Sequence, residues 1–323
     1  MIRGEICMTD SGQILKNIRD NIAKVIVGRE RTVDLLLVCL AAGGHALVED
    51  VPGTGKTLMA RSLAASASLA FSRIQFTPDL LPSDVTGLNY FDQGKSAFVF
   101  RRGPVFTNIL LADEINRATP RTQSALLECM AEQQVTVDGE TRQLTDPFLV
   151  IATQNPVETL GTYPLPEAQM DRFLMQISMG DMSVDEEVRM IDRFITREPL
   201  TELQPAASGE DIIRVRSACR AVRVHRDLRR YMAELVHRTR GGSGAAAGEG
   251  VSPRGTLALL RASQGYALLQ GRDYVVPEDI REVTLPVLSH RCLSRSIASA
   301  SEKEARIRTA IASTEVPTED WSR

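Results

Sequence analysis

The chain has 323 residues, 43% of them hydrophobic and 24% charged, and its formal net charge is −3 with a sequence pI of about 5.9. This composition is typical of a globular protein in water, and the charge excludes a global attraction to nucleic acid or to an anionic membrane. The five cysteines are scattered without a CxxC pair, which favours reduced thiols over a disulfide framework or a metal site. The first residues lack the apolar core of a signal peptide, Met8 is an alternative start, and we expect a cytoplasmic protein without a membrane anchor.

Helical and strand-like patterns alternate over the first 180 residues. Two amphipathic helices are predicted between residues 13 and 42, with a break at Val27 and Gly28. Five short apolar runs then alternate with helical stretches, which predicts a parallel five-stranded sheet with helices on both faces: HALVE, FSRIQF, NILLAD, FLVIAT and FLMQISM. Hairpin insertions are expected at residues 88–106 and 135–144, and the second turns at Asp138-Gly139, a dipeptide that suits a type I′ turn.

Beyond residue 180 the strand patterns stop and helical periodicity dominates. Helices are predicted over 183–197, 210–239, 253–270 and 277–291, followed by a tail that forms a further, fraying helix. A loop of composition GGSGAAAGEG precedes the third of these helices and has the character of a flexible linker. The change from α/β to all-α predicts an α/β domain of residues 1–182, a linker of residues 183–208, and a helical domain with a tail of residues 209–323.

The segment EDVPGTGKT, residues 49–57, carries the clearest chemical signal, because a predicted buried strand enters it and a predicted helix leaves it. Glycines at 53 and 55 allow the backbone to curl, so that successive N–H groups face phosphate oxygens at a helix N-terminus. In such a P-loop Lys56 reaches the β- and γ-phosphates and the Thr57 hydroxyl binds Mg²⁺. Asp50 stands where the full pattern has its first glycine, and aspartate tolerates a tight turn. The sequence therefore predicts a site for ATP and Mg²⁺, lined by Gly53, Thr54, Gly55, Lys56, Thr57 and Leu58.

Acidic and amide side chains follow two later apolar runs. Asp113 and Glu114 end the run NILLAD, and Thr153, Gln154 and Asn155 end the run FLVIAT. Open α/β sheets bind ligands at the carboxyl ends of their strands, so we expect these residues to lie beside the P-loop. Asp113 is predicted to hold Mg²⁺, directly or through water, and Glu114 to polarise the attacking water. An amide at the end of the second run would contact the γ-phosphate or that water.

Taken in chain order, these motifs resemble the AAA+ ATPases, and specifically the MoxR family. The matching strings cover most of the chain from about residue 13 to residue 291: VIVGRE, GGHALVEDVPGTGKT, RIQFTPDLLPSDVTG, LLADEINRA, QSALLECMAEQQVTVDG, VIATQNP, YPLPEAQMDRFLM, SPRG, GRDYVVPEDI and SHR. The resemblance implies an αβα P-loop domain with a helix-2 insertion, followed by an all-α lid. It also implies a ring oligomer, in this family a hexamer.

The resemblance assigns roles to individual residues. The Walker A residues, the Walker B pair and sensor 1 fall on Lys56, Thr57, Asp113, Glu114 and Asn155. Arg172 matches the arginine finger that enters a neighbouring subunit's site. Arg254 matches sensor 2, acting either in its own site or in a neighbour's. Val27 and Gly28 match the segment that packs on adenine. An arginine supplied across an interface would couple hydrolysis to assembly.

The leading interpretation is an ATPase that remodels or matures a partner protein, and the resemblance implies partners with von Willebrand factor A domains. The two hairpin insertions are candidate contacts with that partner, and ordinary packing on the ring is the equal alternative. A nucleic-acid-translocating motor is a second interpretation: Lys95, Arg101 and Arg102 give it some support, whereas Asp138 and the acidic pI oppose it. A nucleotide-dependent switch with negligible turnover is a third. A magnesium-chelatase-like subunit is a close variant of the first.

Overall fold

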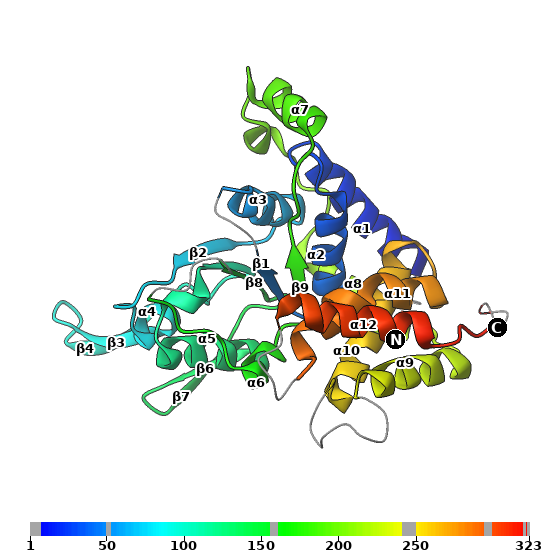
Figure 1. Ribbon diagram of the computed structural model, residues 1–323. Helices are drawn as coiled ribbons and strands as arrows, with labels where there is room; N and C mark the ends of the chain where they lie inside the picture. Colours follow the sequence, from blue (N-terminus) through cyan, green and yellow to red (C-terminus); the bar gives the residue numbers. More distant parts are fainter. Residues whose placement is uncertain are drawn as a thin grey trace, which may run out of the picture.

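The computed structural model describes residues 8–49, 53–155, 161–240, 250–293, 299–318 and 321 (Figure 1). Two helices open the described chain, α1 (Met8–Ala23) and α2 (Glu30–Ala42). The predicted break between them is confirmed, since Gly28 lies in the connecting turn with φ 67°. Most of the loop GGSGAAAGEG, residues 241–249, and the departure from the P-loop pattern at Asp50 lie outside the described residues.

A parallel five-stranded sheet forms the centre of the molecule. Its spatial order is β2-β5-β8-β1-β9, with β1 (Ala46–Glu49), β2 (Phe71–Gln75), β5 (Ile109–Asp113), β8 (Leu149–Gln154) and β9 (Met175–Ser178). All five predicted strands and their parallel arrangement are confirmed. The connections contain α3 (Lys56–Ser66), α4 (Pro82–Thr86), η1 (Ile115–Arg117), α5 (Pro120–Glu132) and α6 (Glu167–Met170).

Both predicted hairpin insertions are confirmed. The first consists of β3 (Gly87–Asp92) and β4 (Ala97–Arg102), and it extends away from the sheet at the left of Figure 1. The second consists of β6 (Gln134–Val137) and β7 (Glu140–Gln143). Asp138 and Gly139 both have positive φ, 51° and 82°, as a type I′ turn requires.

The strands alternate their side chains between two hydrophobic cores, one on each face of the sheet. Ile109, Leu111 and Ile151 face a core that also contains residues of α1, α2, α3 and the C-terminal helices. Leu110 and Val150 face the other core, which contains residues of α5 and of β6. The sheet is therefore covered on both sides, which explains why its inner strands β5 and β8 are buried and mostly apolar, whereas the edge strand β2 also contains polar residues.

The C-terminal part is helical, as predicted. It consists of α7 (Val184–Phe194), η2 (Pro199–Glu202), α8 (Gly209–Ala221), α9 (Arg226–Thr239), α10 (Pro253–Leu269), α11 (Pro277–Leu288), η3 (Ser289–Arg291) and α12 (Ala300–Ser313). The expected single helix over 210–239 is wrong, because Arg223 leaves the helix to exchange backbone hydrogen bonds with Asp273 and Val275. Helix α7, at the top of Figure 1, lies within the stretch 183–208 that was expected to be a linker, and the domain boundaries stay a prediction. Among the described helices, none is both long and apolar enough to cross a bilayer.

The C-terminal helices are joined to the rest of the molecule by close packing and by buried arginines, of which Arg216 is one. At Gly265 in α10, a Cβ atom would lie 3.1 Å from a methyl group of Val38 in α2, so glycine allows this close approach. Arg216 in α8 is buried and donates hydrogen bonds to the carbonyl oxygens of Leu40 and Phe148 and to the Asp146 carboxylate, the last at 2.6 Å. Lid and sheet therefore share one continuous core.

Candidate functional site

The P-loop segment connects β1 to α3 at the edge of the sheet where the strands end. Gly53 and Gly55 have φ 88° and 91°, and nothing lies within 4 Å of a Cβ atom built at either position. The left-handed backbone therefore explains both glycines. Helix α3 begins at Lys56, and the first N–H groups of a helix have no partner within it. This geometry suits an anion such as a phosphate group.

Asp113 lies at the end of β5 and is held from two sides. Arg73 on β2 donates a hydrogen bond from Nε to Oδ2 of Asp113 at 2.6 Å. The hydroxyl of Thr153 on β8 donates to the other carboxylate oxygen at 3.2 Å. Only 8% of Asp113 is exposed, so its carboxylate is fixed in direction toward the P-loop side of the sheet.

Glu114 follows directly and has an unusual backbone conformation. Its φ of 56° and ψ of 49° place it in the left-handed region, which is rare for a residue with a side chain. Its amide donates to the Thr153 hydroxyl at 2.9 Å. Its carboxylate accepts from Gln75 at 2.7 Å and lies 3.1 Å from Nε of Arg117. Backbone strain of this kind concentrates at functional sites, where neighbouring groups hold it in place.

These segments enclose one cavity of about 350 Å³. Its lining combines the P-loop, the ends of β2 and β5, and the end of β8: Gly53, Thr54, Gly55, Lys56, Thr57, Leu58, Arg73, Gln75, Asp113, Glu114, Thr153, Gln154 and Asn155. Every residue that the sequence placed on the phosphate side of the site therefore lies in one cavity.

A second, apolar pocket adjoins this cavity and shares Thr54, Gly55 and Leu58 with it. Val27 contributes to its lining, together with Met190 and Phe194 of α7. Gly28 lies beside the start of α7, where an added Cβ would come within 2.6 Å of the Glu186 carboxyl carbon. The predicted adenine segment is thus next to the P-loop, with Val27 in the pocket and Gly28 behind it.

The donor atoms in the cavity fit Mg²⁺ together with a nucleotide. Within the described ranges, no group of three or more His, Cys, Asp and Glu side chains could hold a metal ion. Mg²⁺ needs few protein ligands when phosphate oxygens and waters complete its shell. The Thr57 hydroxyl and the Asp113 carboxylate are both in the cavity lining, and both are oxygen donors.

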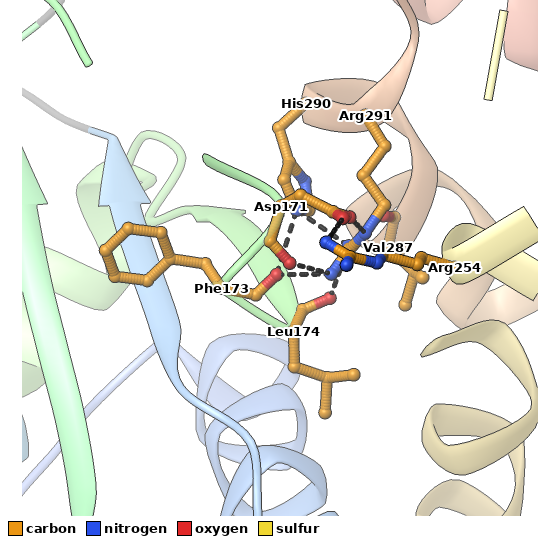
Figure 2. Close-up of polar contacts among 7 residues, drawn as sticks. All are labelled: Asp171, Phe173, Leu174, Arg254, Val287, His290 and Arg291. Atoms are coloured by element: carbon orange, nitrogen blue, oxygen red, sulfur yellow. Dashed lines mark hydrogen bonds and ion pairs between the residues drawn. The ribbon is translucent and has the colours of Figure 1, made fainter. Parts of the chain in front are cut away.

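Arg172 and Arg254 are absent from that lining. Arg172 is exposed and donates a hydrogen bond to the carbonyl oxygen of Leu127 in α5 at 3.0 Å. The guanidinium of Arg254, at the start of α10, lies 3.9 Å from the carboxylate of Asp171 and is 84% exposed. Asp171 also pairs with Arg291 of η3 at 2.7 Å (Figure 2). We call these four residues, Asp171, Arg172, Arg254 and Arg291, the arginine cluster.

Two cavity residues were missed from the sequence, Arg73 and Gln75. They occupy alternate positions on β2, and the parallel register places Gln75 opposite Asp113 of β5. The string RIQF was predicted as a strand, but no local sequence pattern indicates that this strand pairs with β5, which ends in the acidic residues.

Comparison with known proteins agrees with this architecture. Residues 45–175 match the ATPase family associated with various cellular activities (AAA), and residues 244–310 match the AAA lid domain. A candidate ATPase from Cytophaga hutchinsonii, known from a crystal structure, superposes with a TM-score of 0.88 at 40% identity, covering 96% of this chain and 97% of that one.

Sequence relatives include two proteins of similar length. The uncharacterized protein YeaC of Bacillus subtilis is 48% identical over 92% of this chain and 93% of its own length. The chaperone MoxR1 of Mycobacterium tuberculosis is 42% identical over 87% of this chain and 76% of its own length. With this level of identity over nearly the whole of the P-loop and lid regions, the chain belongs to the MoxR family of AAA+ ATPases.

Proposed function

We propose that this chain hydrolyses ATP with Mg²⁺ in a ring whose subunits complete one another's active sites, and that the cycle remodels or matures a partner protein. One observation carries the proposal: the P-loop, both acidic residues and Asn155 share a cavity, whereas the two predicted catalytic arginines lie outside it. A second copy that brings its arginine cluster to this cavity would complete the site. The expected hexamer and the expected cytoplasmic location stay predictions.

Each cavity residue has a role that its position supports. Lys56 would bind the β- and γ-phosphates, and the oxygen atoms of Thr57 and Asp113 would hold Mg²⁺, which neutralises phosphate charge. Glu114, fixed by Gln75 and by the backbone contact to Thr153, would orient a water for attack and accept its proton. Asn155 ends β8 beside it and would contact the γ-phosphate or that water. The apolar pocket at Val27 would receive the purine.

A protein partner is favoured by the exposed tip of the first hairpin. Phe98 and Phe91 are 75% and 54% exposed and stack edge to face on each other. Phe100 and Arg102 are different, since each packs against another side chain: Phe100 lies under Arg142, and Arg102 lies over Phe106. The basic residues that would favour nucleic acid are thus partly used in packing, whereas apolar aromatic surface is free to bind polypeptide. A von Willebrand factor A domain as that polypeptide stays a prediction from the family resemblance.

Steady-state ATPase activity measured against protein concentration tests the shared site. We expect specific activity to rise with concentration as rings form, and Arg172→Ala to lower the turnover of assembled protein by about 10³-fold. Nucleotide binding, followed by a fluorescent analogue, should stay unchanged, because Arg172 is not in the chain's own cavity.

Arg230→Ala is the matched control. This arginine is similarly exposed, at 79%, and its ion pair with Glu234 lies on the surface of α9. We expect Arg230→Ala to have the same ATPase activity and nucleotide binding as the unaltered protein. Activity that is independent of concentration and that survives Arg172→Ala would refute the shared site, and binding without turnover at any concentration would favour a nucleotide-dependent switch.

A further inference from the structure

The arginine cluster is organised around a single carboxylate. Asp171 lies in the turn between α6 and β9, and Figure 2 shows two guanidinium groups from the lid converging on it. Nε of Arg291 donates to Oδ1 of Asp171 at 2.7 Å, and Nη1 of Arg254 lies 3.9 Å from Oδ2. Asp171 therefore joins the sheet side of the molecule to two separate elements of the lid, η3 and α10.

Arg291 fixes the backbone of this turn as well as the side chain of Asp171. Its guanidinium is buried, with 4% of the side chain exposed. It donates to the carbonyl oxygens of Asp171 at 3.1 Å, Phe173 at 2.6 Å and Leu174 at 3.0 Å. The neighbouring His290 contacts the Phe173 carbonyl oxygen at 3.1 Å. A planar guanidinium can make this many fixed hydrogen bonds, whereas an ammonium cannot.

Arg172 is the next residue of the same turn. Its position follows from the backbone that Arg291 holds on one side and from its own hydrogen bond to Leu127 on the other. Arg254 approaches the same carboxylate from the start of α10. Of the two arginines that are missing from the chain's own cavity, Arg172 thus follows Asp171 in the chain and Arg254 reaches the Asp171 carboxylate, while Arg291 holds Asp171 and its turn.

We propose that Asp171, held by Arg291, is a positioning residue for ATP hydrolysis in the neighbouring subunit, because it sets where Arg172 and Arg254 lie relative to each other. This inference rests on the shared site proposed above. Asp171 lies outside the nucleotide cavity of its own chain, so it acts through the two arginines. A misplacement of about 1 Å costs on the order of 100-fold in rate when reacting groups must be aligned. The lid would then contribute to catalysis by holding groups that serve the next subunit.

Asp171→Asn tests the inference in mixtures with Glu114→Gln. Alone, Asp171→Asn should lower kcat about 100-fold and leave the nucleotide dissociation constant unchanged. Glu114→Gln subunits are inactive themselves but retain an intact arginine cluster. In a random 1:1 ring, about a quarter of all sites would combine an intact Glu114 with an intact neighbouring cluster. We therefore expect mixing to restore about a quarter of normal activity, a gain that no misfolded subunit would give.

One parallel mixture and one control variant make the outcome specific. Arg172→Ala mixed with Glu114→Gln should also regain activity, because it tests the shared site alone. Asp146→Asn removes the other carboxylate that pairs with a buried lid arginine, Arg216, and should keep normal kcat even if stability falls. If the Arg172→Ala mixture recovers and the Asp171→Asn mixture does not, the positioning role is wrong and the shared site stands. If neither recovers, the shared site fails, and this inference fails with it.

If Asp171→Asn does not fold, Arg291→Lys can replace it in the same mixing experiment. The lysine keeps the buried positive charge beside Asp171 but loses the hydrogen bonds to the turn. We expect lowered kcat, unchanged nucleotide binding and recovery on mixing. As a further readout, Asp171→Asn should have no additional effect on turnover in an Arg172→Ala/Arg254→Ala background, since residues that act as a unit are not additive. An undiminished effect in that background would overturn the inference.

Discussion

The cavity at the P-loop and the arginine cluster are built in different ways. The cavity is formed by chain segments at one edge of one sheet, and its acidic residues are held by β2 and β8 on either side of β5. The arginine cluster forms only where the lid meets the sheet, since Asp171 and its partner Arg291 are 120 residues apart in the chain. The first region depends on strand register and the second on lid docking.

This difference is consistent with separate locations, within each subunit, for the groups that bind nucleotide and for the arginines that assist hydrolysis. In the proposed site, the P-loop and the acidic pair of a single chain would bind the phosphates and Mg²⁺, since both lie at one edge of its own sheet. Its two predicted catalytic arginines lie outside the cavity, Arg172 bonded to the Leu127 carbonyl oxygen of α5 and Arg254 exposed at the start of α10, as the proposed shared site requires. Under the proposed shared site, nucleotide binding would be a property of the single subunit, and ATP hydrolysis would be a property of the assembly with its lids in place. Three experiments test whether the cavity and the arginine cluster differ in this way.

Glu114→Gln should have the largest effect on turnover. The amide keeps the shape of the carboxylate but cannot accept a proton, so we expect kcat to fall by about 10²- to 10⁴-fold while nucleotide binding is retained. Glu128→Gln, an exposed position on α5, is the matched control. Single-turnover hydrolysis measures the chemical step directly. A rate near normal in Glu114→Gln would mean that another group activates the water.

Lys56→Ala should act on binding, which separates the cavity from the arginine cluster. A charge-assisted contact to phosphate contributes about 3 kcal/mol, so we expect the dissociation constant to rise on the order of 100-fold. Arg254→Ala should change binding to the dilute chain by less than about twofold, because the exposed guanidinium is outside the cavity. Calorimetric titration of both variants gives the comparison. Equal losses would place Arg254 in its own subunit's site.

The sequence predicted the parts of this architecture that depend on local pattern. The inner strands β5 and β8 are largely apolar runs, and the residues at the carboxyl ends of the strands were expected to meet because parallel strands end at one edge. Arg73 and Gln75 were missed because their neighbours depend on the spatial order of strands, which is a non-local property. The ion pair between Asp171 and Arg291 could not be predicted either, because it also depends on non-local packing. Both residues nevertheless lie in strings that resemble the family, YPLPEAQMDRFLM and SHR.

A smaller effect is expected from pH, which should change the free energy of unfolding. A buried histidine lies just before β1, and another lies beside Arg291 of the arginine cluster. His45, just before β1, accepts a hydrogen bond at Nδ1 from the amide of Val150, 3.0 Å away, so it is the neutral Nε2–H tautomer that donates to the Met130 carbonyl oxygen. Burial lowers the pKa of His45 to about 4, with the hydrogen bond to Met130 opposing this shift and the nearby charge of Arg216 adding to it. On the lid side, burial and Arg291 lower the pKa of His290 well below its usual value of 6.5.

Both histidines should make the folded protein sensitive to acid. The unfolded chain binds a proton at each histidine below about pH 6.5 and the folded chain does not, so the free energy of unfolding falls as the pH drops from about 6.5 toward 4. For His45 the loss between pH 7 and pH 5 is about 2 kcal/mol. The His45→Asn side chain can accept the same bond from Val150 and does not titrate, so urea unfolding across this range should have a flatter pH profile. The slope that remains then belongs to other groups, His290 first among them, and a profile as steep as that of the unaltered protein would exclude His45 as a source of acid sensitivity.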